Sequence, residues 1–435
     1  MDPTIIIVFI ALLAVLFIGT PISLGIGFLG VAGILIFLPP QLMEQLALIT
    51  YNQSTSMTTL MIPLYILMAE FLANSNIAAD LFEVISRRLK KIPANLAVSS
   101  IIASALFSAL CGSAPATAAT MGRISIPTML KKGYSTRIAG GTQAAGGNLG
   151  ILIPPSINLI IYGMITETSV AKLFIAGVVP GVILAVAMVA YVMIRSKVDP
   201  TMIVPPKEDV GENTSKVIHT PLSDVLTVGP MVVLIAVIFF TLYSGLATAT
   251  ESAAIGAVLA GVIVFAQRRM TKTCIQKTLL NTASTTCMIL FLMFGGLVFA
   301  LFLTAMGLPQ QISSLVLSAS LNPWVIFLIV NIIFLILGCF LEPLSIMMIV
   351  LPFVFPFMLQ LGFDPIWLGV VLTINCAIGM ITPPVGLNIF VLRGATGLMT
   401  KDIIAGVIPY IIIFALSIVL LCFIPGIATY LPSNM

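Results

Sequence analysis

The sequence has few charged residues. Asp, Glu, Lys and Arg make up 8% of the 435 residues, while 60% are hydrophobic; soluble domains carry about a quarter charged residues. No soluble fold can bury that much apolar surface, so the composition excludes a water-soluble globular protein. The formal net charge of +4 is spread over loops. This distribution indicates membrane topology rather than nucleic-acid binding.

The motifs of common enzymes and metal sites are also missing from the sequence. Its six cysteines are scattered, with no Cys-x-x-Cys pair and no pairing with histidine. The single histidine, His219, lies in a polar loop over 196–224. A metal or redox site built on these residues is therefore not expected. There is no P-loop for ATP and no serine–histidine dyad, so we expect no enzymatic activity and no organic cofactor.

What the sequence has instead is a series of apolar runs. Each is long enough to cross about 30 Å of hydrocarbon as a helix. Their spacing does not fit the strands of about ten residues that build a membrane β-barrel. The runs predict an all-α polytopic membrane protein with about ten crossings. Clear examples are Ile5–Ile18, Leu24–Leu38, Leu173–Met193, Met231–Leu242, Ala253–Phe265 and Ile404–Ile427.

An internal repeat is the most informative feature. At an offset of 229 residues, Ser125–Tyr134 aligns with Val354–Phe363. The same offset pairs Gly140 with Gly369, Gly150 with Gly379, and Pro154-Pro155 with Pro383-Pro384. Glycines and prolines fix backbone shape, so the match predicts two copies of one structural unit.

Basic residues orient the two copies. Lys and Arg cluster around the first copy, at 87–91, 123, 131–132 and 137, whereas the second copy has none between Met306 and Leu392. Because positive residues favour the cytoplasmic side, the copies are predicted to face opposite sides of the membrane. Such inverted-topology repeats are typical of secondary transporters.

Each copy contains a predicted re-entrant hairpin. In the first, the apolar run Leu96–Leu130 is interrupted at 111–120, where Gly112 and Pro115 favour a turn. The equivalent hairpin spans Pro323–Leu361, with its tip at 340–345. We expect both tips to reach the middle of the membrane.

Each copy also contains a helix interrupted by a double proline, in Gly150–Asn158 and in Gly379–Asn388. Two consecutive prolines remove two backbone donors and leave upstream carbonyl groups without helical partners. Non-helical backbone at this depth is tolerated only where it is buried in protein or lines a cavity. Free carbonyls and hydroxyls suit sodium, and half-helix N-termini suit a carboxylate. Two purely structural kinks are the alternative interpretation.

Three carboxylates lie in apolar surroundings. Glu342, at the second tip, is predicted to serve a cation site or a gate; a neutral, hydrogen-bonded structural glutamate is the alternative. Glu70 and Glu251 are weaker candidates, for which pairing with a neighbouring helix is the alternative. The amphipathic segment Ile77–Lys91 predicts an interfacial arm helix with Gln310–Leu321 as its partner. In one interpretation these two segments brace a moving domain. In the other they simply connect helices.

Three motifs resemble those of a known family: Gly112–Gly122, Ile126–Tyr134 and Gly147–Ser156. They look like the large membrane subunit of the tripartite ATP-independent periplasmic (TRAP) transporters, and the resemblance covers nearly the whole chain. It implies an elevator-type fold, in which a transport domain slides against a scaffold in the bacterial inner membrane. It also implies sodium-coupled import of an organic acid, such as a C4-dicarboxylate or sialic acid.

The resemblance implies two protein partners, a small membrane subunit and a soluble periplasmic substrate-binding protein. From the length we expect the small subunit to be a separate chain. Scaffold and arm helices are expected at 1–91 and 171–322, and a C-terminal scaffold helix at 401–435. The transport domain is expected at 92–170 and 323–400.

Site residues follow from the resemblance by position. The expected sodium ligands lie at the two tips and the two broken loops: Gly112, Ser113, Thr117, Gly150, Pro154, Ser156, Leu341, Glu342, Ser345, Gly379, Thr382, Pro383 and Gly386. The organic acid is expected between the tips, near Ser113, Ala114, Pro115, Thr117, Asn158, Glu342, Pro343, Ser345 and Asn388. An ion channel or ion-only exchanger with the same fold is the alternative function, and it predicts flux without a binding protein.

Overall fold

The computed structural model describes residues 7, 10–11, 14–15, 20–204, 221–318 and 321–435. Within these residues the chain is almost entirely helical, apart from an isolated antiparallel bridge between Tyr134 and Ile203. The helices up to the middle of the chain are α2 (Ile22–Phe37), α3 (Leu42–Thr55), α4 (Met61–Ala73), α5 (Ile77–Arg88), α6 (Asn95–Cys111), α7 (Ala114–Lys131), α8 (Thr136–Gly147), η1 (Asn148–Ile151), α9 (Ile157–Thr166), α10 (Val170–Val198) and η2 (Pro200–Met202). Those that follow are α11 (Pro221–Tyr243), α12 (Ala249–Ala266), α13 (Lys272–Ala305), α14 (Leu308–Ser318), α15 (Pro323–Gly338), α16 (Pro343–Gln360), α17 (Pro365–Ile381), α18 (Leu387–Thr396), α19 (Thr400–Phe423) and α20 (Gly426–Ser433).

The helix bounds recur at the offset seen in the sequence. Helix α7 starts at Ala114 and α16 at Pro343, and α8 starts at Thr136 and α17 at Pro365, so both pairs are 229 residues apart. The hairpins α6–α7 and α15–α16 and the broken helices α8–α9 and α17–α18 therefore share one order of elements. The peptide bond between the two prolines is cis in both broken helices.

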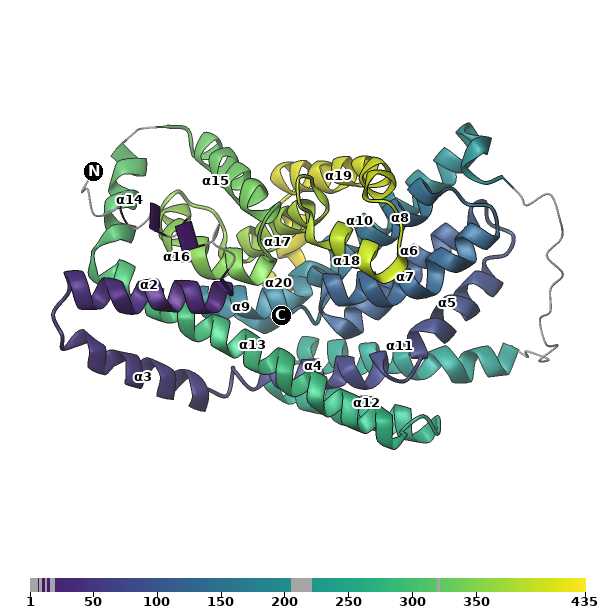
Figure 1. The fold of residues 1–435 in the computed structure, drawn as a ribbon, viewed down its shortest axis with the longest axis horizontal. Coiled ribbons are helices and arrows are strands. Elements are labelled where there is room, and N and C mark those ends of the chain that lie inside the picture. Colours follow the sequence, from purple (N-terminus) through teal and green to yellow (C-terminus); the bar gives the residue numbers. More distant parts are fainter. Residues whose placement is uncertain (1–6, 8–9, 12–13, 16–19, 205–220, 319–320) are drawn as a thin grey trace.

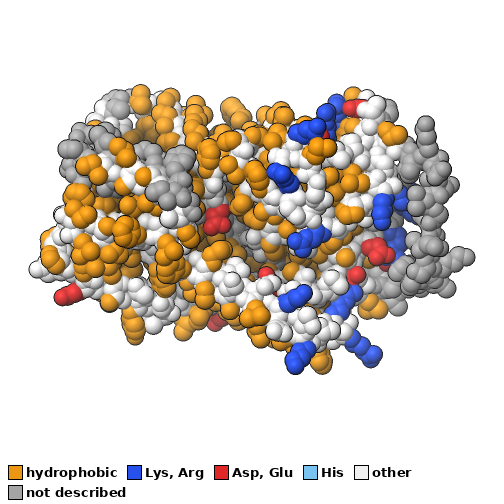
Figure 2. Space-filling model, viewed as in Figure 1, with side chains coloured by type: hydrophobic (Ala, Val, Ile, Leu, Met, Phe, Trp, Pro, Cys, Tyr) orange, Lys and Arg blue, Asp and Glu red, His pale blue; other side chains and the backbone are white. Residues whose placement is uncertain are grey.

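The arm helices α5 and α14 lie toward opposite ends of the long axis of the molecule (Figure 1). Helix α5 is bent by 62° from α4 and buries Ile77, Leu81 and Phe82 on one face. Lys and Arg side chains gather over the half that holds α5, whereas hydrophobic side chains dominate the other half (Figure 2). This distribution agrees with the predicted orientation of the two copies, which stays a prediction.

Length and composition allow six of the described helices to cross a membrane, or seven if the bent pair α4–α5 forms one span. Shorter apolar helices include α6, α9, α15 and α17, which belong to the hairpins and broken helices. The all-α, multi-pass class is confirmed. The number of about ten crossings stays a prediction.

Glycines bring several helix pairs into backbone contact. A Cβ atom on Gly30 of α2 would lie 2.8 Å from the backbone nitrogen of Phe299 in α13, and one on Gly141 of α8 would touch the carbonyl of Gly406 in α19. Such small-residue contacts are how membrane helices gain van der Waals packing without a hydrophobic driving force. The helices form two packed groups. Helices α2, α4, α12 and α13 pack together, whereas α10 and α19 pack on the hairpins and broken helices.

Candidate functional site

The first hairpin tip rests against the first broken helix. Gly112 ends α6 with φ +62°, and a Cβ atom there would lie 2.7 Å from the carbonyl oxygen of Pro155. In the other direction, a Cβ atom on Gly150 would lie 3.3 Å from the carbonyl oxygen of Ser113. Glycine at both positions lets the two backbones meet, as a side chain at either would push them apart. The structure thus brings together the tip and the loop that the sequence assigned to one site.

The second tip meets the second broken helix in the same way. The backbone N–H of Gly386 donates to the carbonyl of Cys339 at 3.1 Å. A Cβ atom on Gly379 would lie 2.5 Å from the Cα of Gly338. Gly386 has φ +64°, which favours glycine, and it starts α18. Both halves therefore place a hairpin tip on the double-proline segment of the same half.

Four buried side-chain oxygens near these contacts lack a well-formed hydrogen bond in the described part of the chain. The amide oxygens of Asn158 and Asn388 have no partner there, whereas the Thr117 hydroxyl lies beside the Cys111 thiol and the Ser345 hydroxyl beside the Glu342 carboxylate. Thr117 and Ser345 lie in the first turns of α7 and α16, directly after the tips, and the asparagines lie at the starts of α9 and α18. A buried oxygen without a partner is costly, so its retention calls for an explanation such as an ion. All four belong to the residues predicted from sequence.

The two halves are joined by asparagine amides. The Asn148 amide donates to the carbonyl of Ala377, and the Asn388 amide donates to the Asn148 side-chain oxygen. The Asn158 amide donates to the Thr373 hydroxyl at 3.0 Å. The Asn148 side chain turns its nitrogen to Ala377, so its oxygen faces Asn388. Asn388 turns its nitrogen to that oxygen, so the Asn388 oxygen points away from Asn148. The same hydrogen bonds that join the halves therefore orient one of the unpaired oxygens.

Other predicted residues have structural partners. The Ser156 hydroxyl caps α9 by accepting from the Leu159 N–H at 3.3 Å, and it donates to the carbonyl of Ile151. The Thr382 hydroxyl donates to the carbonyl of Ile378 at 2.6 Å. Ala114, Pro154, Leu341 and Pro343 are buried, Ser113, Pro115 and Glu342 are partly exposed, and Pro383 is exposed. The Ser156 and Thr382 hydroxyls already donate their hydrogen to a carbonyl, so only their oxygen lone pairs remain for an ion.

Glu70 and Glu251 are both held by neighbouring groups. Glu70 accepts from the amides of Asn74 and Asn281, each at 2.9 Å, and Asn281 lies on α13. Glu251 forms a capping box with Thr248 at the start of α12. Glu70 therefore fits the predicted pairing with a neighbouring helix, whereas the partner of Glu251 is the N-cap residue of its own helix.

Sequence reasoning missed three amides that fix the site. Gln143 of α8 accepts from the hydroxyls of Ser100 and Ser125 and donates to Ser104, which ties both helices of the first hairpin to α8. Asn375 of α17 donates to Asn331 of α15 at 2.7 Å. Together with Asn148, these residues are polar groups within apolar helices. A polar residue in an apolar helix is visible in the sequence, and it indicates that the side chain needs a hydrogen-bond partner inside the protein.

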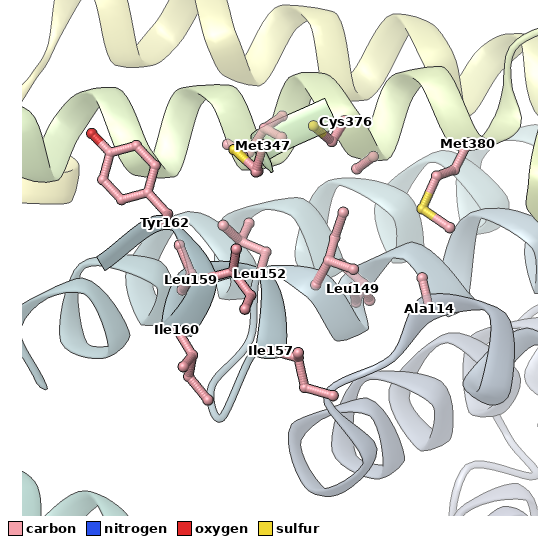
Figure 3. Packing of buried hydrophobic residues seen from close by; sticks show 14 of the residues in the cluster. Ala114, Leu149, Leu152, Ile157, Leu159, Ile160, Tyr162, Met347, Cys376 and Met380 are labelled. Carbon is pink, nitrogen blue, oxygen red and sulfur yellow. The ribbon is translucent and has the colours of Figure 1, made fainter. Parts of the chain in front are cut away.

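Apolar packing surrounds the junction of the halves. Figure 3 shows Met347, Cys376 and Met380 from the second half facing Leu149 and other residues of the first. All four side chains are fully buried. Helix α7 packs on α18 and α16 packs on α9, so each hairpin also contacts the broken helix of the opposite half. The asparagine side chains are buried as well, and burial strengthens their hydrogen bonds.

Comparison with known proteins assigns the family. The family described as "Tripartite ATP-independent periplasmic transporter, DctM component" matches residues 9–427. The C4-dicarboxylate TRAP transporter large permease protein DctM of Pseudomonas aeruginosa is 37% identical, over 94% of each chain. The DctM protein of Vibrio cholerae is 31% identical over 98% of this chain and 97% of its own. The sialic acid TRAP transporter large permease protein SiaM of the same species is 28% identical over 86% of each chain.

A solved structure supports the fold. The crystal structure of the Alcanivorax borkumensis YdaH transporter matches with a TM-score of 0.62 and 13% identity, over 91% of this chain and 90% of that chain. At this identity the match concerns the fold alone. The relatives are named as permeases, which agrees with the expectation that the chain is not an enzyme. The chain belongs to the family of TRAP transporter large membrane subunits.

Proposed function

We propose that this protein is the permease subunit that imports a small organic acid by sodium coupling, with the acid delivered by a periplasmic binding protein. The proposal is supported by four buried oxygens beside the hairpin tips, two from each half, which lack a well-formed hydrogen bond among the described residues; the two asparagine oxygens have no partner there at all. Sodium is a hard cation that binds hydroxyl, amide and carbonyl oxygens, and transporters of this architecture bind it at unwound helix segments. The donor set fits the ion.

Thr117 and Asn158 would serve one sodium site, and Ser345 and Asn388 the other. Backbone carbonyls of the broken loops, such as that of Pro155 beside Gly112, would add further ligands. The organic acid would lie between the tips. Ser113 and Glu342 are the N-cap residues of α7 and α16, and neither side chain caps its helix. Pro115 and Pro343 have no N–H, so the N–H groups of Ala114 and Ala116 in α7 and of Leu344 and Ser345 in α16 would remain for a carboxylate.

Charge neutralisation explains why the ion and the acid would move together. An organic acid brings negative charge into a site enclosed by apolar residues, where an unpaired ion is strongly disfavoured. Bound sodium offsets that charge, so the loaded site becomes less costly to carry across the membrane. Flow of sodium down its gradient then drives uptake of the acid.

We propose an elevator motion, and the packing of the helices supports it. The hairpins and broken helices contact one another across the two halves, with α7 on α18 and α16 on α9. They form one body with α10 and α19, while α2, α4, α12 and α13 form another layer. We propose that the first body moves against this layer. The division of the chain into scaffold and transport parts at 171 and 401 stays a prediction, because α10 and α19 pack on the hairpin body.

The relatives favour a dicarboxylate over sialic acid. The relative named as a C4-dicarboxylate permease is 37% identical, whereas the one named as a sialic acid permease is 28% identical. We therefore propose a small dicarboxylate as substrate, a separate small membrane subunit and a periplasmic binding protein as partners, and the bacterial inner membrane as the location.

Uptake into proteoliposomes tests the proposal. The three components are reconstituted, and uptake of a labelled C4-dicarboxylate is measured with an inward sodium gradient and with choline in its place. The expected result is uptake that needs both the gradient and the binding protein. Equal uptake in choline would overturn sodium coupling. Flux without the binding protein would favour the channel or exchanger alternative.

A further inference from the structure

A cavity of about 520 Å³ opens at the end of the molecule where Lys and Arg gather (Figure 2). It lies between α8, the C-terminal end of α10, η2 and α19. Its lining includes Ser135, Arg137, Tyr191, Arg195, Met202 and Pro409. None of these residues belongs to the hairpin tips or the broken loops. The cavity is therefore separate from the proposed transport site.

One of the two arginines is already paired. Arg195 contacts Asp199 at 3.0 Å, and the Asp199 carboxylate also accepts from the Thr201 hydroxyl. The hydrogen bond from Thr201 holds the pKa of Asp199 below its usual range, so this carboxylate stays charged and keeps Arg195 engaged. The Arg195–Asp199 ion pair therefore adds no net charge to the cavity.

Arg137, an exposed residue in the first turn of α8, supplies a second positive charge to the lining. It forms no ion pair or side-chain hydrogen bond with any residue that the structure describes. The nearby Asp402 accepts instead from the Thr136 hydroxyl at 2.8 Å. A guanidinium group presents a planar set of donors that matches phosphate oxygens. The cavity therefore suits an anion with several oxygens.

The walls beside the arginines are apolar and continue onto exposed helix faces. Ile138, Met202 and Pro409 line the cavity. Ile194, 63% exposed, directly precedes the lining residue Arg195 on α10, and Ile408, 52% exposed, directly precedes the lining residue Pro409 on α19. Exposed isoleucines on membrane helices face acyl chains. An anion with an attached apolar chain matches this pattern better than a free inorganic anion.

We propose that this cavity binds the phosphate headgroup of an anionic phospholipid, with Arg137 holding the phosphate and Ile194 and Ile408 contacting the acyl chains. Basic pockets between membrane helices on the cytoplasmic side are a recurring form of lipid headgroup site. The lipid would pack against both α8 and α19, whose backbones already touch at Gly141 and Gly406. It would thereby add to the cohesion of the hairpin body.

Lipid titration of the full-length protein tests the site. Purified protein in detergent is titrated with phosphatidylglycerol, with phosphatidylcholine and with inorganic phosphate, and binding is read by native mass spectrometry. The variants are Arg137→Gln and, as a control, Lys131→Gln, which removes the same charge at an exposed position outside the cavity. A third variant, Ala405→Leu, fills the cavity without changing its charge.

We expect phosphatidylglycerol to bind more tightly than phosphatidylcholine, and Arg137→Gln to weaken phosphatidylglycerol binding about tenfold, as loss of a charge-assisted contact does. Ala405→Leu should weaken it as well, while Lys131→Gln should not. Thermal unfolding of each variant verifies that it is folded. Equal effects of Arg137→Gln and Lys131→Gln, or equal binding of the two lipids, would overturn the proposal. Arg137-dependent binding of inorganic phosphate without a lipid preference would overturn the lipid and assign a free anion.

Discussion

The amide of Asn148 donates a hydrogen bond to the carbonyl oxygen of Ala377, and these two positions are separated by the repeat offset of 229 residues. The bond therefore joins equivalent points of the two halves. Asn388 adds a second link by donating to Asn148. All three residues are fully buried. We expect the site to depend on this junction because these residues lie next to the breaks in both broken helices.

Replacing Asn148 should loosen the junction. In Asn148→Ala the Asn388 amide loses an acceptor and the Ala377 carbonyl loses a donor, which costs about 1 to 3 kcal/mol per unsatisfied group. We expect a clear drop in the midpoint of thermal unfolding in detergent. Asn52→Ala makes the same change at an exposed helical position and should be nearly neutral. Equal midpoints for the two variants would contradict a role for this bond.

Much of this arrangement could be predicted from the sequence. Prolines and glycines such as Gly150 and Pro155 report backbone shape directly, so the repeat, the hairpins and the broken helices were found by alignment at one offset. The all-α class followed from the apolar runs. These features depend on local chemistry, which a sequence carries.

Partners of polar side chains could not be predicted in the same way. Ser156 and Thr117 are both small hydroxyl residues in the predicted site, but the Ser156 hydroxyl caps α9, whereas the Thr117 hydroxyl caps no helix and lies beside the Cys111 thiol. Only the three-dimensional packing separates these cases. The bond between Asn148 and Ala377 was missed for the same reason, because it joins positions far apart in the chain.

The first tip should tolerate no side chain at Gly112. Both Gly112 and Gly397 have positive φ, so alanine at either adds a left-handed strain of about 1 to 2 kcal/mol. At Gly112 the Cβ atom would also meet Pro155, whereas at Gly397 no atom lies within 4 Å. We expect Gly112→Ala to abolish uptake in proteoliposomes and Gly397→Ala to retain most of it. If both variants lose uptake equally, close contact at the tip is not the cause.

Ion pairs should fix the arm helix α5 to α11. Asp224 contacts Arg87 at 3.0 Å and Arg88 at 2.9 Å, and its side chain is 10% exposed. A double-mutant cycle of Asp224→Ala and Arg87→Ala should show a coupling energy of about 0.5 to 3 kcal/mol in unfolding experiments. The more exposed pair Arg195 and Asp199 serves as a comparison, and a weaker coupling is expected there because solvent screens the two charges. Additive effects of the Asp224 and Arg87 changes would refute the predicted link.

Sodium binding to the purified permease tests the central claim most directly. Binding of radioactive sodium is measured by scintillation proximity for the wild type, Thr117→Val and Ser345→Ala, with Thr128→Val as a control on the same helix as Thr117, where the hydroxyl bonds only to the Ile124 carbonyl. Each site variant loses one of the four buried oxygens, so we expect sodium affinity to fall about tenfold or more, as loss of a contact to a charged group does. The control should match the wild type. Unchanged sodium affinity in both Thr117→Val and Ser345→Ala would contradict sodium binding at the two hairpin tips.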